Sequence, residues 1–318
     1  YFTLPPYCII TLSATICPYN FDISCKSINR KINHSIRVSK ICKKVAKSLN
    51  LDVELIELAN FIGLVHDIGR FTQWEKYHTY NDLKSIDHAM IGIKILFDDN
   101  LIKKFVVDNK YYDIILNAIK CHNEYILDCK LDEKSLIMTK ILRDADKIDI
   151  LYMVANGEIK IEKPSLDITQ EVIFEFFQKK CINNKYLNTE SDKILLRFAL
   201  VFDLNYSFSL NYVLNNDYLN QMYKKLENNN LIEPYYEFAQ KYLDDVASSP
   251  LQGQLNSLIS NLKDLSSTLS SLSSKMKSQA NDIKNAQGTL ETQTKTTTAL
   301  SDEYNAQIGE ISELDSLS

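Results

Sequence analysis

The chain has 318 residues, enough for one large domain or two ordinary ones, and its apolar content of 45% suits a packed core. Its 36 basic and 41 acidic residues give a net charge of −5, which argues against a surface for duplex nucleic acid but allows a small phosphorylated substrate in a local basic pocket. The seven cysteines are scattered without a CxxC pair, so we interpret them as free thiols in a reducing compartment.

The first 25 residues are interpreted as an N-terminal extension of uncertain structure. Residues 1–17 are apolar, but they lack a basic beginning and contain Pro5 and Pro6, which disfavours a signal peptide. No stretch approaches the roughly 20 uninterrupted apolar residues that a membrane-spanning helix needs. The sequence therefore predicts a cytoplasmic chain without a membrane partner.

Residues 26–247 have the pattern of an all-α domain. Apolar residues recur there at intervals of three and four, and glycine is scarce, at seven in the whole chain. Sheets with tight hairpins normally use more glycine than this. Asp52 can cap the second helix, and Pro164 falls in a connection. The expected helices span residues 26–49, 53–67, 84–98, 109–122, 133–155, 168–180, 190–203, 216–227 and 231–247.

The composition changes at residues 248–250, after which Ser, Thr, Gln and Leu dominate. Apolar residues then alternate at steps of three and four from Leu255 to Leu314, which predicts a coiled-coil tail over 251–318. Gly288 and the threonines of residues 292–298 weaken its middle, so one rod and two helical blocks are both open. Such a seam needs a partner helix, which could come from the same chain, from a second copy of it or from another protein.

A set of histidines and aspartates falls at expected helix positions in the first domain. Neutral imidazole nitrogen together with carboxylate oxygen suits Zn, Mn, Fe or Co. Adjacent residues on a helix point about 100° apart, so the pair His66-Asp67 can reach one metal only where the helix ends, and Gly69 is expected to end it. The candidates are His34 in NHSIRVSK, His66 and Asp67 in GLVHDIGRF, His88 in SIDHAMIG, His122 in KCHNE and Asp146 in ILRDADKIDIL.

A lone His-Asp dipeptide arises by chance, but the order H…HD…D with HDIG and ADK is much harder to obtain by accident. The strings HDIGRF, YHTYNDLKSIDHAMIG and RDADKID resemble the HD superfamily of metal-dependent phosphohydrolases, in particular an uncharacterised bacterial HDIG-type branch. The resemblance covers about residues 26–246, including FALVFDLNYSFSLNYV, and leaves the tail uncovered. It implies an HD-type helical bundle followed by the tail.

The resemblance also implies a ligand set. His34, His66, Asp67 and Asp146 match the family's four ligands, and His88 and His122 match the two extra histidines of binuclear members. The cofactor would be one or two divalent transition-metal ions, such as Mn, Fe, Co, Zn or Ni. Asp144 and Asp149, on the same expected helix as Asp146, receive no assignment, and His78 lies outside the metal pattern.

The expected chemistry is hydrolysis of a phosphate ester, by analogy a nucleotide or nucleotide-like compound, by metal-activated water. Asp67 and Arg70 are the catalytic candidates, and Arg70, Lys84 and Lys147 are candidates for gripping phosphate oxygens. Two other classes of function remain open. One is a nucleotide-binding sensor without turnover, which signals through the coiled coil, and the other is a structural protein whose functional part is the tail.

Overall fold

The computed structural model of the chain describes residues 25–316 except 107, 128–129, 228 and 248–249. Within these residues the structure is made of helices, turns and loops, and no strand is found among them, as an all-α fold requires. The chain divides into two compact units, residues 1–249 and 250–318. The predicted N-terminal extension lies outside the described residues except for Cys25. Among the described helices, none combines the length and the apolarity needed to cross a membrane.

The described part of the first unit is built from short and medium helices. Its α-helices are α2 (Lys26–Ser48), α3 (Val53–Val65), α4 (Gly69–Tyr77), α5 (His88–Ile93), α6 (Tyr112–Cys121), α7 (Glu133–Ala155), α8 (Gln170–Phe177), α9 (Glu190–Ala199), α10 (Ser207–Asn215), α11 (Tyr218–Tyr223) and α12 (Glu233–Ala247). Short helices join them: η2 (Asp82–Lys84), the π-helical η3 (Lys94–Asp98), η4 (Leu101–Lys104), η5 (Asn109–Tyr111), η6 (Asn184–Tyr186), η7 (Leu200–Asp203) and η8 (Asn229–Leu231).

Most expected helices form close to their predicted bounds, and α7 begins and ends as predicted. Asp52 caps α3 through its side chain, which accepts a hydrogen bond from the backbone N–H of Leu55. Two helices, α4 and α10, were not predicted. The helix expected over residues 84–98 begins later than predicted, because η2 ends at Lys84 and α5 begins only at His88; it then continues through η3 to Asp98.

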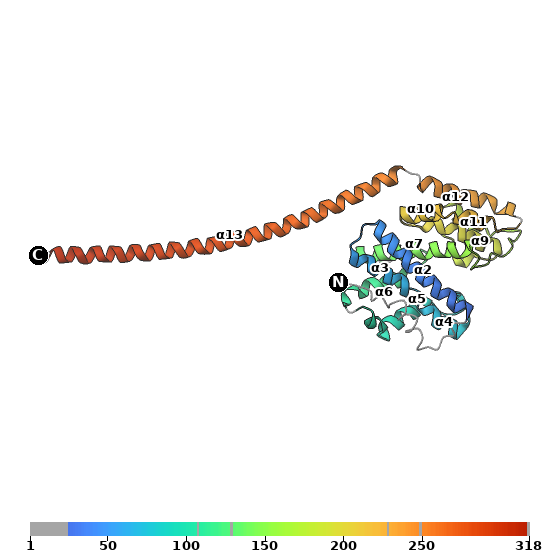
Figure 1. Cartoon of the computed structure of the whole chain (residues 1–318), viewed down its shortest axis with the longest axis horizontal. Helices are drawn as coiled ribbons and strands as arrows, with labels where there is room; N and C mark the ends of the chain where they lie inside the picture. Colours follow the sequence, from blue (N-terminus) through green and yellow to red (C-terminus); the bar gives the residue numbers. More distant parts are fainter. Residues whose placement is uncertain (1–24, 107, 128–129, 228, 248–249, 317–318) are drawn as a thin grey trace. The chain divides into compact units, whose positions relative to one another are not determined.

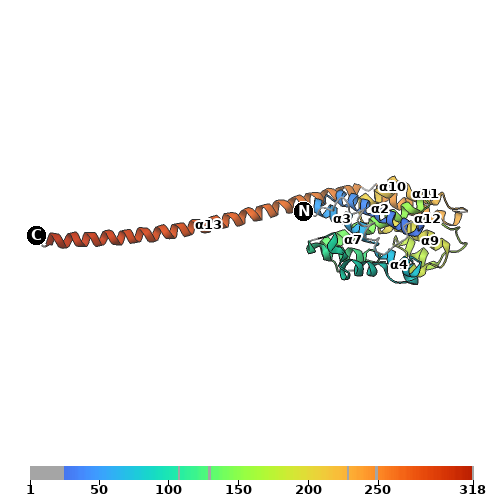
Figure 2. The same ribbon diagram turned by 60° about the horizontal axis from the view of Figure 1, so that its bottom comes forward.

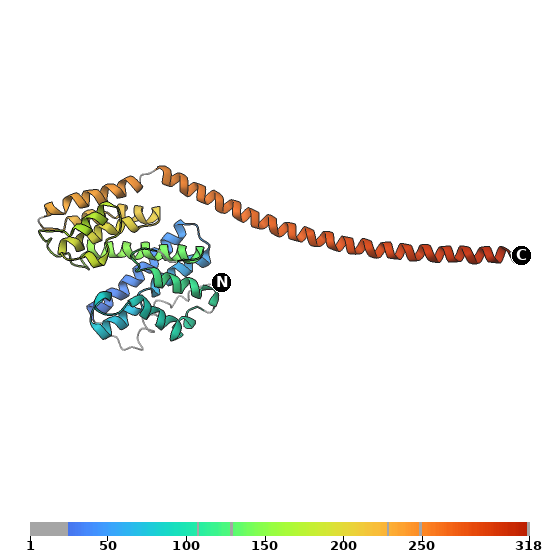
Figure 3. The same ribbon diagram turned by 180° about the vertical axis from the view of Figure 1, so that it is seen from behind.

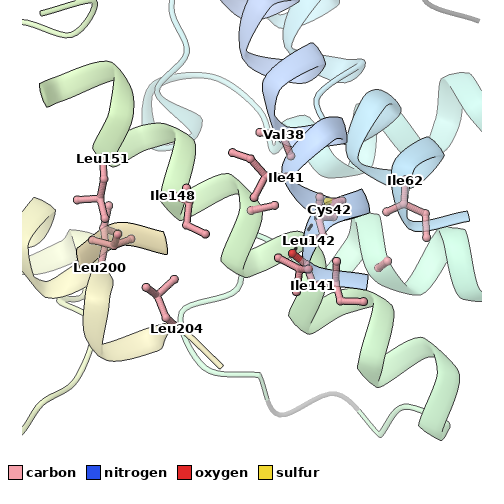
Figure 4. Packing of buried hydrophobic residues seen from close by; sticks show 14 of the residues in the cluster. Val38, Ile41, Cys42, Ile62, Ile141, Leu142, Ile148, Leu151, Leu200 and Leu204 are labelled. Atoms are coloured by element: carbon pink, nitrogen blue, oxygen red, sulfur yellow. Dashed lines mark hydrogen bonds between the residues drawn. The ribbon is translucent and has the colours of Figure 1, made fainter. Parts of the chain in front are cut away.

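The central helix α7 lies between two groups of helices, with α2, α3 and α6 on one side and α10 and α11 on the other (Figures 1 and 3). Leu142 of α7 and Ile41 of α2 belong to this buried core (Figure 4). The packing of α2 against α3 is close at Gly63, where a Cβ atom would lie 2.8 Å from the Cα atom of Ser39. The core therefore holds α2, α3 and α7 in fixed positions. His34 lies on α2, Asp146 lies on α7, and His66 and Asp67 directly follow α3.

The second unit is the single helix α13 (Pro250–Ser316), which is continuous and gently curved (Figure 2). Of the two possibilities left open for the tail, the structure forms one rod and does not break near Gly288. The described apolar residues of the heptad seam are all exposed, with Leu269 at 64% and Leu272 at 55%. The tail is thus one helix with an uncovered apolar stripe, and its pairing in a coiled coil stays a prediction.

Candidate metal centre

The pair His66-Asp67 lies in a turn between α3 and α4, because α3 ends at Val65 and α4 begins at Gly69. A break at this pair was predicted, but the role given to Gly69 was wrong. Gly69 starts the next helix instead of ending the previous one. A Cβ atom there would lie 2.1 Å from the backbone oxygen of His88, so glycine is needed for the close packing of α4 on α5.

Four buried imidazoles share one arrangement of their ring nitrogens. In each ring the Nδ1 atom is hydrogen-bonded to an oxygen acceptor, and in His88 and His122 the Nε2 atoms face each other at 3.1 Å. A bond to an acceptor places the proton on Nδ1 and leaves the Nε2 lone pair for a metal. The acceptors are Asp149 Oδ2 for His34 at 2.7 Å, Gly63 O for His66 at 2.8 Å, Asp82 Oδ2 for His88 at 2.8 Å and Ile119 O for His122 at 2.6 Å.

Asp67 lies between the two pairs of histidines, and each of its carboxylate oxygens faces a different pair. Its Oδ2 atom is 3.5 Å from His34 Nε2 and 3.7 Å from His66 Nε2. Its Oδ1 atom is 3.3 Å from His88 Nε2, and His122 belongs to the same cluster of ligand atoms. Two neighbouring sets of three potential ligands therefore share one carboxylate.

Asp146 completes the first set from α7. Its Oδ1 atom is 3.1 Å from His34 Nε2 and 3.8 Å from His66 Nε2, and its side chain keeps 21% of its surface exposed. Neither of these buried Nε2 atoms makes a hydrogen bond of acceptable geometry with any described residue. Two buried lone pairs without a partner, facing two carboxylates, are a costly arrangement that a cation would satisfy.

Burial would raise the pKa of Asp67, but Lys31, His66, Arg70 and His88 hold it well below its ordinary range. Asp146 behaves alike, because His34 and His66 outweigh the effect of its burial and leave its pKa well below normal. The centre thus offers two ionised carboxylates.

Burial, together with the neighbouring imidazoles of His88 and His66, lowers the pKa of His122 to about 3. His122 is therefore neutral at pH 7. Neutral imidazole with ionised carboxylate is the donor set that suits divalent transition metals, so the residues present fit the cofactor that was expected.

Lys31 enters the centre from α2 and was not predicted. Its Nζ atom is 2.6 Å from Asp67 Oδ2, the oxygen that faces His34 and His66. A lysine three residues before His34 lies on the same face of the helix, so this spacing could have revealed it. Its ammonium partly neutralises the buried charge of Asp67.

Asp82 and Gln73 form a second group of residues that the sequence did not reveal. Asp82 accepts a hydrogen bond from His88 and pairs with Arg70, whose Nη1 atom is 2.8 Å from Asp82 Oδ1. Although burial would raise the pKa of Asp82, the bond from His88 and the charges of His88 and Arg70 lower it to about 2. The buried amide of Gln73 donates to the same carboxylate. The group holds the ring of His88 in place.

Arg70 does lie beside the centre, as predicted, with its Nε atom 3.5 Å from Asp67 Oδ1. Its Nη1 atom is engaged, however, by Gln73, Asp82 and the backbone oxygen of Tyr80. The structure thus places Arg70 where it orients Asp67 and Asp82, and its role in gripping phosphate stays a prediction.

The two lysines predicted to bind substrate are in different surroundings. Lys147 is buried, and its Nζ atom is 2.8 Å from Asp203 Oδ2. Lys84 is exposed and lines a separate cavity of about 1070 Å³, next to Arg70 and Asp82. Neither lysine contacts the six candidate ligands in the contacts that the structure shows.

His78 lies apart from the centre, as expected. It is exposed and ends α4 in the left-handed conformation at φ 50°, with its backbone N–H donating to the carbonyl of Trp74. Asp144, which had no assignment, has a structural role: its carboxylate accepts bonds from the backbone N–H groups of Asn205 and Tyr206 and so ties the start of α10 to α7. Asp149, also unassigned, orients His34 and pairs with Arg37.

A cavity of about 500 Å³ opens beside the centre. Its wall includes His122 and Asp146 of the centre, Arg70, and residues of the segment from Cys181 to Asp203. Arg143 supports this wall, because its guanidinium donates to the backbone oxygens of Cys121, His122 and Glu124 and pairs with Asp203. A ligand in this cavity would reach the centre from its open side, where Asp146 is exposed.

Comparison with known proteins identifies part of the first unit. No curated protein and no solved structure matches the chain. Residues 32–151 match the family model of the HD domain. This range contains all six candidate ligands, together with Asp82 and Asp149, and it ends before α8. Residues 32–151 are therefore similar to the HD domain, and the rest of the chain lies outside this match.

Proposed function

We propose that the chain is a metal-dependent phosphohydrolase that cleaves a phosphate ester, with a nucleotide-like compound as substrate. The observation that carries this proposal is the convergence of four imidazole Nε2 atoms on the two oxygens of Asp67, with two of these atoms lacking a hydrogen bond. The HD domain supports the class of reaction, because the family is one of metal-dependent phosphohydrolases.

Two positions for an ion follow from the donor sets. His34, His66, Asp67 and Asp146 would hold one ion, and Asp67, His88 and His122 would hold the other. A divalent transition ion supplies Lewis acidity, which polarises a phosphoryl oxygen and lowers the pKa of water.

The residues around the candidate ligands orient the imidazole rings and place positive charge near Asp67. Asp149 and Asp82 keep the rings of His34 and His88 in one orientation and one tautomer. Lys31 and Arg70 bring positive charge to within 2.6 and 3.5 Å of the two oxygens of Asp67. Positive groups fixed at this position stabilise the charge that develops on phosphoryl oxygens during transfer.

The test is release of phosphate by the purified full-length chain from a panel of mono-, di-, tri- and cyclic nucleotides, with Mn²⁺ or Co²⁺ added. We expect turnover that a chelator abolishes and that Asp67→Asn lowers by about a thousandfold or more, because Asp67 serves both positions. His78→Ala, at an exposed histidine outside the centre, is the matched control and should retain full activity.

Turnover that persists in metal-loaded Asp67→Asn would contradict the role of this residue. Nucleotide binding without any turnover in the whole panel would favour a sensor in place of an enzyme.

A further inference from the structure

The cavity of about 500 Å³ beside the metal centre is large enough for a compound the size of a nucleotide, since pockets for small ligands span roughly 300–1,000 Å³. One part of its wall belongs to the HD domain and includes Asp146. The other part comes from beyond that domain and includes Asn183, Leu196 and Arg197. The second part contains none of the six candidate metal ligands. Its side chains can therefore differ in chemistry without changing the metal centre, and they can select the substrate.

Three of the cations in this wall already pair with carboxylates. Arg70 pairs with Asp82, and both Arg143 and Lys147 pair with Oδ2 of Asp203, at 2.6 and 2.8 Å. These groups hold the wall together, and their charge is shared within the protein. A substrate anion would have to break such a pair in order to bind them.

Arg197 differs from these three cations. It lies on α9, is half-buried, and lines both the 500 Å³ cavity and the neighbouring one. Within the described part of the chain no hydrogen bond or ion pair involves its guanidinium. Burial lowers the pKa of Arg197, and the charge of Glu190 offsets this only in part.

A half-buried guanidinium without a partner is costly, because desolvation of a charge is favourable only when an opposite charge or a set of acceptors replaces water. The planar fork of arginine fits two oxygens of one phosphate or carboxylate group. An anion at Arg197 would supply the partner that this guanidinium lacks among the described residues.

We propose that Arg197 binds a second phosphate group of the substrate, on the side away from the bond that is cleaved. The substrate class is then an organic phosphate that carries two phosphoryl groups, with one at the metal centre and one at Arg197. This inference rests on the proposed function, since the first phosphate is assigned to the metal centre.

Lys193 provides a matched control on the same helix. It lies four residues before Arg197, carries the same charge, and lines the neighbouring cavity but not this one. Its ammonium pairs with Glu190. Lys193→Met removes one positive charge from α9, as Arg197→Met does, but it changes no residue that lines the 500 Å³ cavity.

The experiment is calorimetric titration of the full-length chain loaded with Mn²⁺. Two probes are compared: inorganic phosphate, which has one phosphoryl group, and the methylene-bridged analogue of ADP, which has two and resists cleavage between them. We expect Arg197→Met to weaken binding of the ADP analogue about tenfold or more, the usual effect of losing a charge-assisted pair of hydrogen bonds, and to change phosphate binding by less than about twofold. Arg197→Lys should recover part of the loss, and Lys193→Met should bind as the wild type does.

Equal weakening of both probes in Arg197→Met would overturn the proposal, and so would an unchanged affinity for the ADP analogue or a loss in Lys193→Met as large as that in Arg197→Met. Failure of the wild type to bind the analogue would overturn it as well. If Mn²⁺ and phosphate bind while Arg197→Met has no effect, only this inference fails. If the wild type binds no Mn²⁺, the proposed function fails with it.

Discussion

Asp67 and Lys31 are the two residues on which the charge balance of the centre depends. Without a metal, the ammonium of Lys31 contacts the same carboxylate oxygen that faces His34 and His66. A divalent ion held by that oxygen would lie close to this ammonium, and like charges repel each other strongly where water is scarce. Lys31 should therefore weaken metal binding while it stabilises the metal-free protein.

We predict that Lys31→Met raises the affinity for Mn²⁺ on the order of tenfold, because it removes this repulsion. Lys43→Met is the control, since Lys43 is on the same helix and pairs with Glu57 away from the centre. Metal titration monitored by calorimetry measures both variants. A lower affinity in Lys31→Met would mean that the lysine supports the ligands instead of competing with the ion.

At the residue scale, the sequence indicated the candidate metal ligands better than the residues that orient those ligands or line the cavity. The six candidate ligands were found because their order and their local strings are distinctive, and the structure brings all six together. Asp82 and Arg197 gave no signal, since their positions depend on the path of loops and on packing beyond the HD domain. Lys84 and Lys147 were chosen for nearness in sequence to His88 and Asp146. Lys147 lines the 500 Å³ cavity and Lys84 lines the neighbouring one, and their role in substrate binding stays a prediction.

At the scale of elements, α9 is held at its N-terminus by Asp192. This buried carboxylate accepts bonds from the backbone N–H groups of Thr169, Asn188 and Thr189 and from the hydroxyl of Thr169. Burial would raise the pKa of Asp192, but these bonds outweigh it and lower the pKa below its ordinary value of 3.8. The network thus stabilises the helix that carries Arg197.

We predict that Asp192→Ala lowers the free energy of unfolding by about 3 kcal/mol at neutral pH, since four hydrogen bonds to one buried carboxylate are lost. A depressed pKa contributes stability above the unfolded pKa and loses it as the pH falls through the folded value. The difference in the free energy of unfolding between wild type and variant should therefore become smaller below pH ~4. Urea unfolding across this range measures it, and a gap that does not depend on pH would contradict the account.

Substitution of alanine for glycine should have opposite effects on stability at Gly69 and at Gly288. At Gly69 a Cβ atom would meet the backbone of α5, so Gly69→Ala should destabilise the first unit by about 1–3 kcal/mol. At Gly288 nothing lies within 4 Å, so Gly288→Ala should stabilise α13 locally by about 1 kcal/mol. Hydrogen exchange of the backbone amides around each position measures both effects. Stabilisation at Gly69 would refute the close contact of α4 with α5.

The two helices that were not predicted show where periodicity fails. Gly69 was interpreted as a stop signal, but its function is close packing, which leaves no trace in the local pattern. Three residues separate η7 from α10, and Asp144 of α7, some 60 residues earlier, accepts hydrogen bonds from the backbone N–H groups of Asn205 and Tyr206 just before α10. A helix that is fixed by a distant side chain is determined by tertiary contacts, and local propensity alone does not reveal it.

At the scale of the whole molecule, the first unit contains every residue of the metal centre and of the cavity, and α13 contains none. A helix of 67 residues is about 100 Å long. Its described seam residues are exposed, as an unpartnered coiled-coil stripe would be. We propose that the tail serves assembly, through a second copy of this helix.

We predict that a chain ending at Ser249 keeps its full activity and is monomeric, while the full-length chain self-associates. Light scattering gives the two masses, and phosphate release gives the two activities. The same number of chains per particle in both would refute self-association through α13. Lost activity in the shorter chain would show that the tail contributes to the first unit.

The central claim is that one carboxylate, Asp67, joins two metal positions. Anomalous scattering from crystals of the metal-loaded full-length chain tests it most directly. We predict two ions per chain, one among His34, His66 and Asp146 and the other between His88 and His122, with Asp67 bound to both. A single ion would contradict the shared centre, and the absence of any ion at these residues would contradict the account as a whole.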